Sequence, residues 1–203
     1  TYHYQSKDEK FMPLILFAVG IAALLGCIKD AFYIVVASPM LVLSIAYVGS
    51  YYYSLTCAYM AGASGLRKNL NLMIPNLFMI VGVLWAYLLI TIALTILVHF
   101  YPQMALDYAK GLLDTAIMTG TLIIFNGICD KYYWTGVILV AIVLIPSAAI
   151  LPMLLRDMDT FLGSPLNLQW GLVIYGVGML VSTVISCILR VVLYKVPAMR
   201  GKL

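Results

Sequence analysis

The chain has 203 residues, of which 64% are hydrophobic and only 10% charged, and its formal net charge is +4. A soluble domain of this size carries about 25% charged residues, so the mean hydropathy of +1.04 indicates a polytopic membrane protein. No basic cluster is larger than a pair of residues, and we therefore expect no nucleic-acid partner.

Six apolar segments approach or exceed the roughly 20 residues that a membrane-spanning helix requires. They cover about residues 11–28, 31–53, 72–100, 111–129, 133–154 and 170–192. The strands of a membrane barrel alternate lipid-facing and lumen-facing residues, and these segments show no such alternation. We therefore predict an all-α polytopic membrane protein, with one six-span domain over residues 1–203.

The positions of Lys and Arg beside the spans predict the topology, because cytoplasmic loops carry an excess of both residues. With the N-terminus inside, the cytoplasmic side holds nine of them: Lys7, Lys10, Arg67, Lys68, Lys131, Arg190, Lys195, Arg200 and Lys202. The outer side holds three: Lys29, Lys110 and Arg156. Both termini are expected in the cytoplasm, and the location is expected to be the cell (plasma) membrane.

A polar segment, residues 61–71, separates the second span from the third. The third span is longer than the bilayer requires, because 29 residues (72–100) at 1.5 Å each extend about 40 Å, against a hydrocarbon core of about 30 Å. Pro75 is expected at the start of this helix, where proline is tolerated. Two interpretations stay open: the helices tilt, or they project into the cytosol and carry the polar segment towards a soluble partner.

Ionisable residues are few within the predicted spans, and the candidate carboxylate among them is Asp114, about one turn into the fourth span. Such a carboxylate suits proton or cation coupling, but it equally suits a boundary aspartate near Lys110, four residues earlier. His3 and His99 are far apart, and the four cysteines lack metal-ligand spacing, so no metal site is expected.

Two further groups are candidates for a translocation path or for helix packing. Trp85 and Tyr87 interrupt the aliphatic third span, where they either line a pathway or contact other helices. In the sixth span, Gly178, Ser182 and Ser186 recur every four residues, with Tyr175 close to the same side, as is typical of a close helix contact.

Enzyme signatures are absent from the sequence, which lacks His-Glu-x-x-His, the phosphate-binding Gly-x-x-x-x-Gly-Lys and Gly-x-Ser-x-Gly. Intramembrane hydrolysis also needs a nucleophile with its base or paired carboxylates near mid-membrane. We therefore do not expect this chain to be an enzyme.

The predicted arrangement resembles the permease subunits of type-2 ABC exporters, especially the short bacterial peptide exporters. The shared features are six spans, both termini inside, a polar segment before the first span and a cytosolic turn after the second. The resemblance implies an interfacial pre-helix over residues 1–10, a coupling turn over residues 58–71 and an outer loop over residues 156–169. It also implies a cytosolic ABC ATPase subunit that binds ATP and Mg, a second six-span copy, and no cofactor on this chain.

The resemblance places the contact with the ATPase on Gly62, Ser64, Gly65, Leu66, Arg67, Lys68 and Asn69. Family members often carry an acidic residue just before this turn, whereas residues 59–64 have none. The expected function is the membrane-spanning subunit of an ATP-driven exporter of peptides or other amphipathic substrates. The alternatives are the substrate-binding subunit of an energy-coupling-factor importer and a non-catalytic structural subunit of a larger membrane complex.

Overall fold

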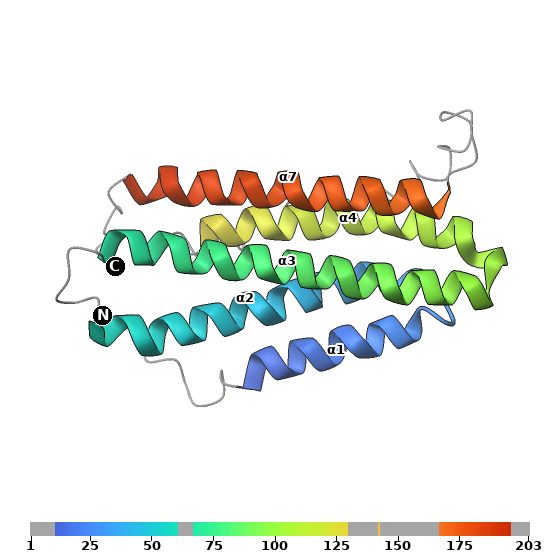
Figure 1. The fold of residues 1–203 in the computed structure, drawn as a ribbon, viewed down its shortest axis with the longest axis horizontal. Helices are drawn as coiled ribbons and strands as arrows, with labels where there is room; N and C mark the ends of the chain where they lie inside the picture. Colours follow the sequence, from blue (N-terminus) through green and yellow to red (C-terminus); the bar gives the residue numbers. More distant parts are fainter. Residues whose placement is uncertain (1–10, 61–66, 130–141, 143–166, 196–203) are drawn as a thin grey trace.

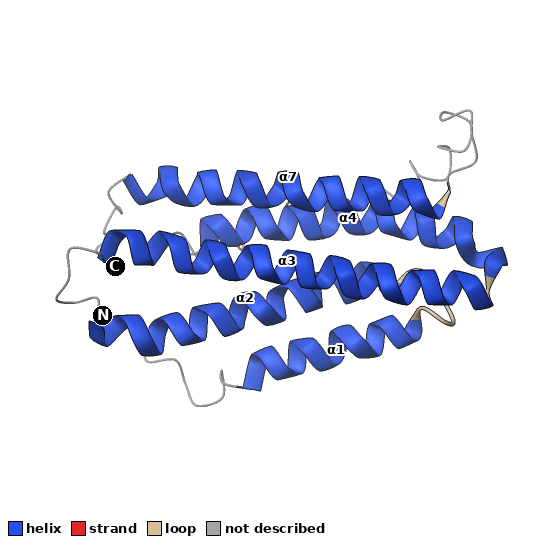
Figure 2. Ribbon diagram, viewed as in Figure 1, coloured by secondary structure: helices blue, strands red, loops and turns tan. Residues whose placement is uncertain are grey.

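A computed structural model of the chain describes residues 11–60, 67–129, 142 and 167–195. The helices are α1 (Met12–Gly26), α2 (Tyr33–Met60), α3 (Arg67–Phe100), the short 3-10 helix η3 (Pro102–Met104), α4 (Ala105–Cys129) and α7 (Leu168–Lys195) (Figure 1). Every regular element in these ranges is helical, which confirms the all-α prediction for them (Figure 2). The predicted pre-helix 1–10 and, apart from residue 142, the fifth span lie outside the described residues, as does most of the outer loop 156–169.

Three of the described helices are long and apolar enough to cross a membrane, over Met73–Phe100, Pro102–Ile128 and Leu168–Leu193. Two shorter apolar helical stretches, Met12–Gly26 and Tyr33–Val48, accompany them. The chain is therefore a membrane protein by the length and composition of its helices. The α3 helix has 34 residues, which at 1.5 Å per residue extend about 51 Å.

Two helices begin before the apolar spans predicted for them. The α3 helix begins at Arg67 instead of residue 72, so Pro75 is its ninth residue and lies inside the helix, not at its start. The α4 helix begins at Ala105 instead of residue 111. The physical reason is the same in both cases: hydropathy marks where a helix enters the hydrocarbon, whereas backbone hydrogen bonding continues through the polar residues that precede it.

The helices form two closely packed units, which we call the N-terminal unit (α1, α2 and α3) and the C-terminal unit (α4 and α7). Within the N-terminal unit, a Cβ added at Gly82 of α3 would lie 3.2 Å from the Val42 carbonyl oxygen of α2. Within the C-terminal unit, a Cβ added at Gly171 of α7 would lie 3.1 Å from the Ala109 Cα of α4. Glycine thus allows the helix backbones inside each unit to approach closely.

The α1–α2 and α3–α4 connections lie at the same end of the bundle, which we call the connection end. The Tyr108 hydroxyl of α4 donates a hydrogen bond of 2.9 Å to the Cys27 carbonyl oxygen. A Cβ added at Gly111 would lie 3.2 Å from the Ala31 carbonyl oxygen, and the start of α7 packs here against Ala109. The ends of α1 and α3 and the starts of α2, α4 and α7 therefore lie close together at the connection end.

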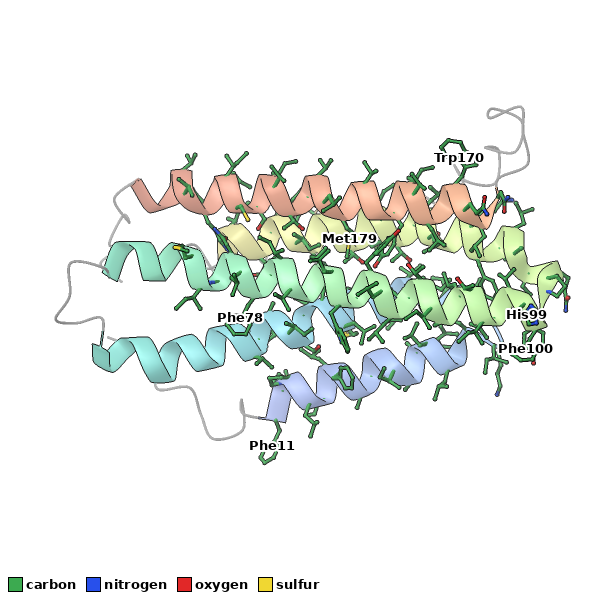
Figure 3. The ribbon with its side chains drawn as sticks, in the orientation of Figure 1. Phe11, Phe78, His99, Phe100, Trp170 and Met179 are labelled. Carbon is green, nitrogen blue, oxygen red and sulfur yellow. The ribbon has the colours of Figure 1, made fainter. Side chains whose placement is uncertain are left out.

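The outward faces of α3 and α7 carry large exposed apolar side chains. On α3 these include Leu77, Ile80, Val81, Leu84, Trp85, Leu88, Ile92 and Ile96. On α7 they include Val173, Val177, Leu180, Val181, Val184 and Ile188. Trp170 and Phe11 point away from the bundle on opposite sides, whereas Met179 is buried inside it (Figure 3). Such faces suit a hydrocarbon environment, because leaving them in water costs about 25 cal/mol per Å².

Candidate functional site: polar contacts inside the helix bundle

The predicted ATPase contact falls mostly outside the described residues. Gly62, Ser64, Gly65 and Leu66 lie between the end of α2 and the start of α3. Arg67, Lys68 and Asn69 form the first turn of α3, where the structure describes the helix but not these side chains. The coupling role of these seven residues therefore stays a prediction.

The two aromatic candidates of α3 lie on different faces of that helix. Trp85 is 46% exposed, on the outward apolar face between Leu84 and Leu88. Tyr87 points inward and stacks on Tyr175 of α7, with ring centroids 5.9 Å apart and an interplanar angle of 21°. The bundle therefore brings Tyr87 and Tyr175 together and leaves Trp85 apart from them.

Three buried hydroxyl groups meet where α2, α4 and α7 come together, and we call Ser38, Thr119 and Tyr175 the hydroxyl latch. The Ser38 Oγ and the Tyr175 hydroxyl lie 2.6 Å apart, and Thr119 donates a hydrogen bond of 3.0 Å to the Ser38 Oγ. All three side chains are fully buried. The latch therefore satisfies hydroxyls that would each cost free energy if buried without a partner.

The small residues of α7 pack against α4. A Cβ added at Gly120 would lie 2.5 Å from the Ser182 Oγ, and one added at Gly127 would lie 2.7 Å from the Ser186 Oγ. A Cβ added at Gly178 would lie 3.3 Å from the Ala116 Cβ. The close contact between α4 and α7 thus includes Gly178, Ser182 and Ser186. Small residues at four-residue spacing are typical of such a helix contact.

An arginine joins three helices at the other end of the bundle, which we call the Arg190 end. The Arg190 side chain of α7 is 8% exposed. Its Nη1 donates to the Asn76 Oδ1 of α3, and its Nη2 donates to the Asn126 Oδ1 of α4, both at 3.0 Å. The planar guanidinium presents donors in a fixed fork, so one side chain can hold two neighbouring helices.

Asp114 takes no part in the hydroxyl latch or in the Arg190 contact. Because α4 begins at Ala105, Asp114 is its tenth residue and not a first-turn residue. Its side chain is half-buried, and its Oδ1 is buried without a hydrogen-bond partner. A buried carboxylate oxygen of this kind is costly unless it is paired or protonated, so both interpretations of Asp114 stay open.

Sequence reasoning missed Ser38, Asn76 and Asn126 as members of this site. Each is a single small polar residue within an apolar segment, and Ser38 and Asn76 are adjacent to Pro39 and Pro75. A polar residue beside a proline inside a predicted span is the signal that points to the first two. Asn126 has no comparable signal.

A narrow crevice, too small to hold a water molecule, lies between the two units. Its lining comes from α2, α3 and α4 and includes Pro39, Val42, Met79, Thr119, Ile123 and Asn126. Thr119 belongs to the hydroxyl latch and Asn126 to the Arg190 contact, so one residue of each polar cluster lines the crevice.

The described polar groups inside the bundle hold neighbouring helices together through hydrogen bonds. They are chiefly neutral hydroxyls and amides grouped around one guanidinium. Among the described residues, no group of three or more His, Cys, Asp or Glu side chains is placed to hold a metal ion. Comparison of the chain with protein-family models, with curated proteins and with solved structures finds no match.

Proposed function

We propose that the chain is the membrane-spanning subunit of an ATP-driven exporter in the cell membrane. It forms the translocation path for a peptide or other amphipathic substrate and works with a separate cytosolic ATPase subunit and a second copy of the six-span domain. The observation that carries the proposal is the extension of α2 and α3 up to the polar segment that joins them.

The lengths of α2 and α3 support the proposal, because both helices are longer than a bilayer requires. The α2 helix has 28 residues and the α3 helix 34, so the two helices extend about 42 Å and about 51 Å, against a hydrocarbon core of about 30 Å. The apolar segment of α3 begins at about residue 72, so Arg67 and Lys68 precede it by about one turn. A soluble partner that binds Arg67 and Lys68 can therefore move α3, because both residues belong to the same helix as the apolar segment.

Such a partner drives transport by changing the relative stability of two arrangements of the bundle. Closure of the ATPase around ATP displaces the turn, and the long helices transmit this movement to the rest of the spans. The substrate shifts the equilibrium by the difference between its affinities for the two arrangements. Arg67 and Lys68 then bind an acidic surface of the ATPase, with Gly62 and Gly65 permitting close approach.

A non-catalytic structural subunit of a larger membrane complex is the second candidate. The exposed apolar faces of α3 and α7 favour it, because each offers a continuous surface on which another membrane helix can pack. This candidate requires no ATPase, so the two proposals predict different partners.

Charge reversal of the turn tests the proposal. The full chain is purified in a gentle detergent from its native host, and soluble ATPase subunits that copurify are quantified. We expect an ATPase of nucleotide-binding-domain size with the native chain, and at least about tenfold less with Arg67→Glu/Lys68→Glu, a difference of about 1.4 kcal/mol.

The matched control is Lys29→Glu/Lys110→Glu, which makes the same change of net charge at the connection end. Both variants must first insert to the native level with native topology, because Lys and Arg also determine orientation. Full ATPase recovery with the first variant removes the role proposed for the turn. Absence of any ATPase with the native chain contradicts the exporter proposal and supports the structural subunit.

A further inference from the structure

The contact surface between the two units, which we call the inter-unit seam, differs from the contacts inside each unit. Close backbone approach across the seam occurs at the connection end, where a Cβ added at Gly111 would lie 3.2 Å from the Ala31 carbonyl oxygen. Tyr108 donates to the Cys27 carbonyl oxygen at the same end. Farther along the seam, the described hydrogen bonds between the units join side chains only.

The hydrogen bonds at mid-seam and at the Arg190 end lie beside helix-interior prolines. Ser38, which bonds to Thr119 and Tyr175 across the seam, precedes Pro39 inside α2. Asn76, which accepts from Arg190, follows Pro75 inside α3. Proline has no backbone N–H and removes one helical hydrogen bond, so helices bend most readily at such positions. The α2 and α3 helices therefore each lose a backbone hydrogen bond close to a residue that bonds to the C-terminal unit.

The crevice lies on this seam. Its walls come from both units, through Val42 of α2, Met79 of α3 and Ile123 of α4. Such a void lacks contact atoms on one side, so the packing that holds the units together is weaker there. Between mid-seam and the Arg190 end, the inter-unit seam therefore has three features in common. Its hydrogen bonds join side chains only, two of its helices contain proline, and its packing leaves a narrow crevice.

We propose that the two units separate along the inter-unit seam at the Arg190 end, turning about the connection end, and that the crevice widens into the start of a path for an apolar or amphipathic substrate. Opening breaks the bonds of Ser38 to Thr119 and Tyr175, together with the Arg190–Asn76 bond. The Arg190–Asn126 bond persists, because both residues belong to the C-terminal unit. The path rests on the proposed transport function, whereas the opening itself does not.

The test measures the access of water to the crevice wall. Met79→Cys is introduced into a chain whose four native cysteines are replaced by serine, and the protein is reconstituted in lipid nanodiscs. Met79 is 1% exposed, so its replacement by cysteine should react slowly with a membrane-impermeant methanethiosulfonate. Adding Ser38→Ala, which removes two latch bonds, should raise the rate about tenfold or more. Tyr175→Phe, which keeps the ring and removes one bond, should raise it less.

The control position is Ala116→Cys, because Ala116 is also buried but faces Gly178 inside the C-terminal unit. Its reaction rate should not change when the latch is removed. An equal acceleration at both positions means general loosening of the bundle and overturns the proposal. An unchanged rate at Met79→Cys with both latch variants overturns it as well. No ATPase is present in this assay, so its outcome is independent of the copurification test.

Discussion

The Ser38 Oγ and the Tyr175 hydroxyl lie 2.6 Å apart although 137 residues separate them in the sequence. This contact joins α2 to α7 inside the bundle, and the Tyr175 ring also stacks on Tyr87 of α3. Thr119 of α4 donates to the same Ser38 oxygen. Four helices therefore meet around one pair of hydroxyl groups.

The Ser38–Tyr175 pair should show a measurable coupling energy. Hydrogen bonds between side chains of membrane helices contribute about 0.6 kcal/mol on average and up to about 1.7 kcal/mol. We expect Ser38→Ala and Tyr175→Phe each to lower the free energy of unfolding. The double variant should lose less than the sum of the two single variants, measured by unfolding the reconstituted protein with SDS. Additive losses would show that the two hydroxyls are not energetically coupled.

The two glycines of α4 that face serines should differ in their tolerance of alanine. A Cβ at Gly127 would meet the Ser186 carbonyl oxygen at 3.0 Å as well as its Oγ, whereas at Gly120 the closest atom is the Ser182 Oγ. A hydroxyl can rotate away, but a helix backbone must shift. We therefore expect Gly127→Ala to lower stability by about 1–3 kcal/mol and Gly120→Ala by less, in a thermal unfolding assay.

A rescue experiment separates these two causes. Ser182→Ala should restore most of the stability lost in Gly120→Ala, because it removes the oxygen that the new methyl group meets. Ser186→Ala should restore little of the stability lost in Gly127→Ala, because the carbonyl oxygen remains. Equal rescue at both positions would contradict the assignment of the second contact to the backbone.

The two amide acceptors of Arg190 should have different effects on the seam. Hydrogen bonds to charged groups contribute about 1.5–3 kcal/mol, so Asn76→Ala and Asn126→Ala should both lower stability. Only Asn76→Ala removes a bond between the two units, so we expect it to increase thiol modification of Met79→Cys more than Asn126→Ala does, although Asn126 also lines the crevice. An equal increase with Asn126→Ala, whose bond lies inside the C-terminal unit, would contradict this division.

Trp85 should be in contact with lipid near the middle of the bilayer. Its side chain is 46% exposed, and it lies close to the midpoint of the apolar span Met73–Phe100. In the variant Trp134→Phe/Trp170→Phe, we expect lipids brominated deep in the acyl chain to quench its fluorescence more strongly than quenchers at the headgroup. The matched variant that retains only Trp170, the third residue of α7, should show the opposite order. Absence of quenching at Trp85 would mean that another protein surface covers this face.

Much of the helix pattern was predictable from local hydropathy. The predicted segment 11–28 corresponds to α1, and the predicted end of the third span at residue 100 coincides with the last residue of α3. The α3 and α4 helices begin before the spans predicted at residues 72 and 111, because polar residues can extend a helix beyond its apolar part. Pro75 was placed at a helix start for the same reason.

The candidate site was predictable only in part. The four-residue spacing of Gly178, Ser182 and Ser186 indicated a close helix contact, and the structure shows that α4 is the neighbouring helix. Tyr87 and Tyr175 were named separately, with nothing in the sequence to pair them. Arg190 was counted among the cytoplasmic cations, whereas its side chain is buried between two asparagines.

The sequence by itself determined that the described part of the chain is all-helical and that it contains helices long and apolar enough to cross a membrane. Hydropathy is a sum over neighbouring residues, so it needs no knowledge of the fold. Only the tertiary structure decided which polar groups meet, as in the contact of Arg190 with Asn76, 114 residues earlier. The physical reason is that such contacts depend on how each helix is rotated about its axis, and helix packing determines that rotation.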